Sequence, residues 1–143
     1  MATAIVMIVM VLTRCGGDKG AELTVEEIQL QKLSSTWTCS KAMKDGVIQS
    51  AYADNFKLTI AGSPGASSFT YNCSGRPDLS PWPANGTWTF GTNPQTDIMR
   101  NDGLAVNYVV TDNQLDVTFN YQGPGFPART KDILGQWVFT FSK

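Results

Sequence analysis

The stretch QLDVTFNY, residues 114–121, decides the fold class, because large apolar residues and polar residues alternate along it without a break. Leu115, Val117, Phe119 and Tyr121 would lie on one side of an extended chain, and the residues between them are polar. Successive side chains of a β-strand point to opposite faces of a sheet, so a period of two indicates a strand with one buried and one solvated face. The stretch therefore predicts a half-buried β-strand.

The same period of two recurs along most of the chain. The alternating apolar positions are Trp37 and Cys39; Phe56, Leu58 and Ile60; Phe69, Tyr71 and Cys73; Trp88 and Phe90; Leu104, Val106, Tyr108 and Val110; and Trp137, Phe139 and Phe141. A weaker strand over residues 96–100 brings the number to about eight, joined by short turns. An antiparallel meander of this size removes its free edges best by closing on itself. We therefore expect an all-β fold, an eight-stranded antiparallel barrel.

A short helix is expected immediately before the barrel. Thr24 is followed three residues later by Glu27, which is the capping-box pattern of a helix N-terminus. The period changes from helical to two at Leu33, so the helix should end near Lys32.

The first 22 residues have a different composition. Residues 2–12, ATAIVMIVMVL, are apolar or nearly so, too short to cross a ~30 Å hydrocarbon core as a helix but typical of the apolar part of a signal peptide. Cys15 follows, and the small polar residues after it suit a flexible tether. The sequence thus predicts a signal-like segment at 1–14, a tether at 15–22 and a barrel domain at 23–143.

Composition argues against catalysis and nucleic-acid binding. The chain has no histidine, which removes the usual general base and the common Ser/His and Cys/His nucleophile pairs. Its 11 basic and 12 acidic residues give a net charge of -1, so no broad field attracts phosphate backbones. We expect no enzyme, no metal or cofactor and no nucleic-acid partner.

The opening of the first strand carries a resemblance to a known family. The stretch LSSTW, residues 33–37, resembles the Gly-x-Trp start of the lipocalin and calycin superfamily, with Ser35 in place of the glycine. Residues 22–143 as a whole, with EEIQLQKLSSTW, SPWPANGTWTFG and GQWVFTFSK, resemble lipocalin-like domains of short surface lipoproteins from Gram-negative bacteria, many of which are uncharacterised. Lipocalins place a basic side chain from the barrel's end against this tryptophan. The resemblance implies that Lys143 packs on Trp37 and closes the barrel there.

The end of the signal-like segment fits the same family in part. Bacterial lipoprotein signals end in a leucine, two small residues and the cysteine that is acylated. Here Leu12, Thr13 and Cys15 match this pattern, and Arg14 departs from it. The resemblance implies lipid attachment at Cys15, export, and a location at the outer membrane or cell surface.

Three further groups of residues are candidate sites. Cys39 and Cys73 both point inward by parity and could form a disulfide or remain two buried free thiols. Trp82 stands between two prolines and either rests on a partner or folds back as a lid on the barrel mouth. The longest irregular stretch, 123–131, is a candidate contact surface through Phe126, Arg129 and Lys131.

Three functional hypotheses follow from these observations. The first is a non-enzymatic lipoprotein, membrane-anchored through Cys15, with a binding or structural role at the cell surface. The second is a self-associating subunit of an extracellular filament, in which the β-branched residues of 2–12 are donated as a strand to a neighbour. The third is a carrier of a small apolar ligand, of unknown identity, which requires a cavity inside the barrel.

Overall fold

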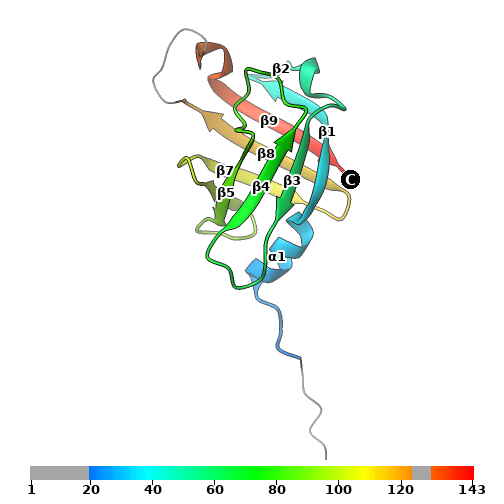
Figure 1. The fold of residues 1–143 in the computed structure, drawn as a ribbon, viewed down its shortest axis with the longest axis vertical. Coiled ribbons are helices and arrows are strands. Elements are labelled where there is room, and N and C mark those ends of the chain that lie inside the picture. The colour runs from blue at the N-terminus through cyan, green and yellow to red at the C-terminus, as the bar shows by residue number, and fades with distance from the viewer. Residues whose placement is uncertain (1–19, 124–129) are drawn as a thin grey trace, which may run out of the picture.

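The computed structural model describes residues 20–123 and 130–143, and within them the fold is a β-barrel preceded by a short helix (Figure 1). The elements in chain order are α1 (Val25–Leu33), β1 (Ser35–Lys44), β2 (Val47–Ile48), η1 (Ser50–Tyr52), β3 (Lys57–Ala61), β4 (Phe69–Ser74), β5 (Asn85–Phe90), β6 (Asp97–Arg100), β7 (Ala105–Val110), β8 (Gln114–Tyr121), η2 (Thr130–Ile133) and β9 (Gly135–Ser142). Here η denotes a short 3-10 helix.

The strands form an antiparallel meander that closes through β1 and β9. These two strands pair from Thr38↔Ser142 to Lys44↔Trp137, with a bulge between Cys39 and Lys41. The ring contains β1 and β3 to β9, which confirms the predicted eight-stranded barrel. Strand β2 is additional. It forms a hairpin with the last two residues of β1, Met43 and Lys44, and is not part of the ring.

Helix α1 begins at the predicted capping box and ends at Leu33. The backbone N–H of Thr24 donates to the Glu27 carboxylate at 2.7 Å, and the backbone N–H of Glu27 donates to the Thr24 hydroxyl at 3.2 Å. Leu30 and Leu33 are buried against the end of the barrel. A third contact comes from Gln29, whose side-chain oxygen accepts from the Tyr108 hydroxyl at 3.3 Å. The helix therefore covers one end of the barrel, which we call the helix end.

The interior is filled by the alternating residues that the sequence analysis placed inward. Phe139 lies near its centre and stacks on Trp137, Phe119 and Phe141, with ring centroids 5.4 to 5.9 Å apart. Four residues expected inside, Phe90, Leu104, Val110 and Tyr121, are only partly buried, because each stands at or just outside the end of its strand. Burial of this many aromatic and aliphatic side chains is the main source of stability.

The two ends of the barrel differ. At the helix end lie α1, residues 62–68 and 91–96, the turn at 111–113 and the chain terminus at Lys143. At the opposite end, which we call the mouth end, lie the β1–β2 hairpin, residues 49–56 and 75–84, the connection that follows β6, and η2. Figure 1 shows α1 and β2 at opposite ends. The longer irregular segments thus gather at the mouth end.

Two tryptophans join strands to the helical turns before them. The indole N–H of Trp37 donates to the carbonyl of Leu33, four residues earlier, at 2.8 Å. The indole N–H of Trp137 donates to the carbonyl of Ile133, also four residues earlier, at 2.8 Å. Since β1 and β9 run antiparallel, the two indoles stand at opposite ends of the same strand pair. Each bond satisfies a carbonyl that the end of a helix leaves free.

The mouth end of the β1–β9 pair depends on Gly135. Its φ of +131° is unfavourable for other residues, and a Cβ there would lie 2.3 Å from a carboxylate oxygen of Asp45. That carboxylate accepts from the backbone N–H of Gln136 at 2.8 Å. We predict that Gly135→Ala lowers the free energy of unfolding by about 2–4 kcal/mol, from backbone strain and a displaced hydrogen bond.

The matched control is Gly46→Ala in the adjacent hairpin. Gly46 also has a positive φ, +80°, but nothing lies within 4 Å of an added Cβ. This variant should lose only about 1–2 kcal/mol, from the backbone conformation alone. Denaturant unfolding of both variants checks the prediction, and equal losses would show that the contact with Asp45 is not required.

Candidate functional site

Residues 75–84, which we call the plug segment, lie at the mouth of the barrel, and two of them, Pro81 and Trp82, are buried in it. Its Trp82 is buried, with 3% of its surface exposed. The indole contacts four rings of the interior, with centroid distances of 5.6 Å to Phe119, 5.8 Å to Tyr71, 6.0 Å to Phe139 and 6.1 Å to Phe56. The sequence left open whether Trp82 rests on a partner or folds back as a lid on the barrel mouth. In the structure it folds back as a lid.

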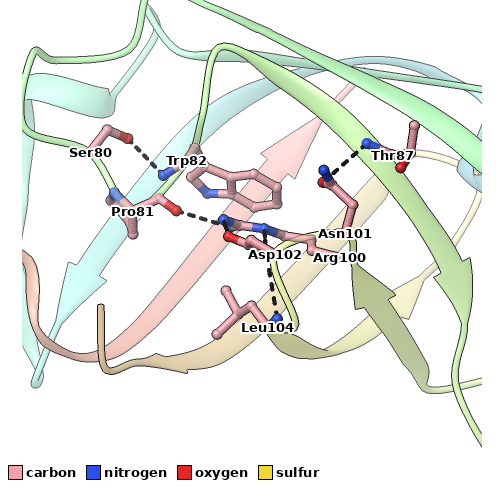
Figure 2. A network of polar contacts seen from close by, with 8 residues as sticks. All are labelled: Ser80, Pro81, Trp82, Thr87, Arg100, Asn101, Asp102 and Leu104. Atoms are coloured by element: carbon pink, nitrogen blue, oxygen red, sulfur yellow. Dashed lines mark hydrogen bonds and ion pairs between the residues drawn. The ribbon is translucent and has the colours of Figure 1, made fainter. Parts of the chain in front are cut away.

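A buried arginine lies beneath this lid. Arg100, the last residue of β6, is 2% exposed, and its guanidinium carbon lies 5.1 Å from the centroid of the Trp82 ring (Figure 2). The rings of Tyr71 and Phe119 are each 5.9 Å away. Three aromatic side chains thus surround the cation, an arrangement that stabilises it electrostatically.

The same guanidinium is paired with a carboxylate from the next turn. Its Nε donates to Asp102 Oδ1 at 3.2 Å, and its Nη2 forms an ion pair with the second oxygen of Asp102. A buried charge needs such a partner, because desolvation of an unpaired cation is very unfavourable. The Asp102 side chain itself stands at the rim and is 38% exposed. The ion pair therefore spans the boundary between the interior and solvent.

Arg100 also holds the plug segment in place. Its Nη1 donates to the carbonyl of Pro81 at 2.9 Å, as Figure 2 shows. Beyond this bond, the hydroxyl of Tyr52 donates to the carbonyl of Leu79 at 3.4 Å, and the backbone N–H of Trp82 donates to the Ser80 hydroxyl within the segment. Few hydrogen bonds therefore connect the middle of the plug segment to the barrel.

Two polar groups in the plugged mouth have no hydrogen-bond partner among the described residues: the hydroxyl of Tyr71 and the indole N–H of Trp82. A buried unsatisfied group costs about 1–3 kcal/mol. Burial of an indole contributes about 4–6 kcal/mol, from 150–250 Å² at 25 cal/mol per Å². The two unsatisfied groups therefore offset part of the stabilisation that burial of the indole provides. Burial also raises the pKa of the Tyr71 hydroxyl, which keeps it neutral.

Little space remains inside the barrel with the plug segment in place. A void beneath Trp82, lined mainly by apolar side chains such as Leu58, Ile98 and Val117, offers a water-sized molecule about 20 Å³. Pockets that hold small organic ligands measure about 300–1,000 Å³. The plugged barrel therefore has no room for such a ligand in this cavity.

The two barrel cysteines are buried free thiols, so the disulfide alternative is wrong. Cys39 is on β1 and Cys73 on β4, and β3 lies between these strands. Neighbouring strands are ~4.8 Å apart, so β1 and β4 are separated by about 9–10 Å, and Cys73 stands level with Trp37 and not with Cys39, whereas disulfides need Cα atoms within about 7 Å. Burial raises the pKa of Cys39 to about 11 and that of Cys73 to about 12, so both thiols stay protonated and unreactive.

At the helix end, the structure brings together the two residues expected to close the barrel. The ammonium nitrogen of Lys143 lies 4.6 Å from the centroid of the Trp37 ring. The backbone N–H of Lys143 donates to the carbonyl of Asn113 at 3.3 Å, which fixes the end of the chain. The cation thus covers an indole that already holds the end of α1.

The structure does not describe the side chains of the remaining candidate residues. Cys15, Phe126 and Arg129 lie outside the described residues. Lys131 belongs to η2 at the mouth end, next to the strand pair that closes the barrel.

Arg100 was not among the residues predicted from the sequence, although its signal was present. Arg100 follows Ile98 at a spacing of two in the weak strand 96–100, which places a charged residue on the inward face. An inward charge in a small barrel indicates a buried ion pair, and Asp102 stands two residues later. Pattern alone could not show that the plug segment lies above it.

The fold and this mouth define the molecule as a small closed antiparallel barrel with a plugged end. No family model, no curated protein and no solved structure matches the chain. Within residues 20–123 and 130–143, no three His, Cys, Asp or Glu residues are grouped so as to hold a metal ion. No helix in the same part of the chain is long and apolar enough to cross a membrane.

The position of Trp82 in the plug segment predicts that the indole N–H groups differ in their hydrogen exchange rates. Those of Trp37 and Trp137 are bonded to carbonyls at 2.8 Å, whereas that of Trp82 has no partner in the described structure. Local opening of the plug segment exposes Trp82 without disturbing the other two. We predict that the Trp82 indole exchanges its hydrogen about tenfold or more faster than the indoles of Trp37 and Trp137, by NMR after assignment of the four tryptophans with Trp→Phe variants. Equal exchange rates would mean that the plug segment opens only when the whole barrel unfolds.

Proposed function

We propose that the chain is a non-enzymatic binding module, an exported lipocalin-like lipoprotein anchored through acylated Cys15, whose mouth end faces away from the membrane. The observation that supports this proposal is the difference between the two ends of the barrel. The chain enters the barrel through α1 at the helix end, and the longer irregular segments lie at the mouth end. Loops carried by a rigid scaffold are the usual place for binding residues.

The distance between the anchor and the barrel fits this arrangement. Cys15 precedes Leu23 by eight residues, which span at most about 26–29 Å when extended. A glycine-rich tether of this length has a mean end-to-end distance of about 16 Å. An acylated Cys15 would therefore keep the helix end close to the bilayer and leave the mouth end free for a partner.

A role in binding rather than catalysis agrees with the chemistry of the chain. It has no histidine to serve as a general base. The barrel thiols are buried with raised pKa values, and the buried guanidinium is paired with Asp102. These groups suit recognition of a ligand better than the transfer of protons or covalent bonds.

The alternative filament subunit would use residues 2–12 as a donated strand. Strand β2 is the one element that could receive it within the described structure, since β2 ends the sheet order and exposes Val47 and Ile48. An edge of two residues offers few backbone hydrogen bonds to an added strand. The lipoprotein is therefore the better supported proposal.

The test is the intact mass of the protein from its native envelope, with sequencing of the N-terminal peptide. The proposal predicts a chain that begins at Cys15 and carries diacylglycerol, because acylation is what holds it to the bilayer. A Cys15→Ser variant should carry no lipid and should leave the membrane fraction. A wild-type chain that retains residues 2–12 without lipid would remove the anchor and support the filament subunit.

A further inference from the structure

The mouth of the barrel is occupied by two groups of the chain that together resemble a ligand. The carboxylate of Asp102 pairs with the guanidinium of Arg100, and the indole of Trp82 lies against the same guanidinium. An aromatic ring and a carboxylate on one cation are the parts of an aromatic carboxylic acid. The rings of Tyr71, Phe119 and Phe139 line the place where the indole lies.

We propose that the mouth is a binding site for a flat aromatic carboxylic acid, which enters when the plug segment withdraws. The ring of the ligand takes the place of the Trp82 indole, and its carboxylate takes the place of Asp102 on Arg100. This inference rests on the proposed binding role and specifies its ligand class. It is independent of the lipid anchor, since the site lies at the other end of the barrel.

The charge of the site selects an anion. Arg100 is the one charged residue that is buried in the described structure, and Asp102 neutralises it from the rim. If Asp102 turns out to solvent, a neutral or cationic ligand would leave the guanidinium buried and unpaired. A carboxylate restores the pairing with the same two-point geometry that Asp102 now provides.

The polar groups without partners favour exchange of the plug for a ligand. Trp82 gains water as a partner for its indole N–H when it leaves the mouth, and the Tyr71 hydroxyl becomes free to donate to a carboxylate beside Arg100. Asp102 is 38% exposed, so it reaches water by a side-chain rotation. Arg100 loses its bond to the Pro81 carbonyl when the plug segment withdraws and gains the carboxylate of the ligand in its place.

The test is titration calorimetry with indole-3-acetate on the full chain carrying Cys15→Ser, so that no lipid competes for the site. Indole, which lacks the carboxylate, is the control ligand. Wild-type protein should bind indole-3-acetate more tightly than indole. Two variants remove the internal competitors: Trp82→Ala vacates the ring position, and Asp102→Asn removes the competing carboxylate.

The two variants should respond differently to the two ligands. Trp82→Ala should tighten the binding of both ligands, by about tenfold or more, because the ring position becomes free. Asp102→Asn should tighten only indole-3-acetate, by about tenfold, because it acts on the carboxylate position alone. Circular dichroism must show that each variant is folded. If Asp102→Asn does not fold, the preference of Trp82→Ala for indole-3-acetate over indole decides the matter.

Two results would overturn the proposal. One is that neither wild type nor folded Trp82→Ala binds indole-3-acetate. The other is that indole and indole-3-acetate bind folded Trp82→Ala equally well, or respond equally to Asp102→Asn, which would mean that Arg100 does not read the carboxylate. A mature protein without lipid, found in the envelope test, would leave this result unaffected, so the two proposals fail separately.

Discussion

The pairing of β1 with β9 is the constraint on which the rest of the structure depends. Without it, the meander would be an open sheet with two exposed edges, and such edges lead to aggregation. The pairing also fixes both ends of the molecule. Trp37 opens β1 and holds α1 through its indole N–H, and Trp137 opens β9 and holds η2 in the same way. Closure of the sheet therefore positions the helix end and the mouth end together.

A closed barrel of this size leaves its interior to side chains, and here nearly all of them are apolar, about half of them aromatic. Arg100 is the exception, since a cation in such a core must be neutralised and shielded. The chain does both with residues from the mouth: Asp102 provides the opposite charge, and the plug segment provides Pro81 and Trp82. The buried charge thus links the core to the loops, and the same contacts make the mouth suitable for an anionic aromatic ligand.

The sequence predicted those parts of the fold that depend on local pattern. Period-two alternation located the strands of the ring, and Thr24 with Glu27 located the helix, because both signals arise from neighbouring residues. Strand β2 was missed because two residues cannot show a period. Parity placed Cys39 and Cys73 on the inner face but could not show that β3 lies between them. The candidate site was predicted only in part: Trp82 was recognised as a lid or a contact, but its partner Arg100 comes from a strand 18 residues away in sequence.

Closure of the barrel is tested most directly by NMR contacts between backbone protons across β1 and β9. The closed barrel predicts cross-strand nuclear Overhauser effects for the pairs Cys39↔Phe141 and Ala42↔Phe139, which are adjacent only if β1 and β9 pair. Contacts along the other strand pairs, without any between β1 and β9, would show an open sheet. In that case the interior, the buried Arg100 and the plugged mouth would all have to be explained differently.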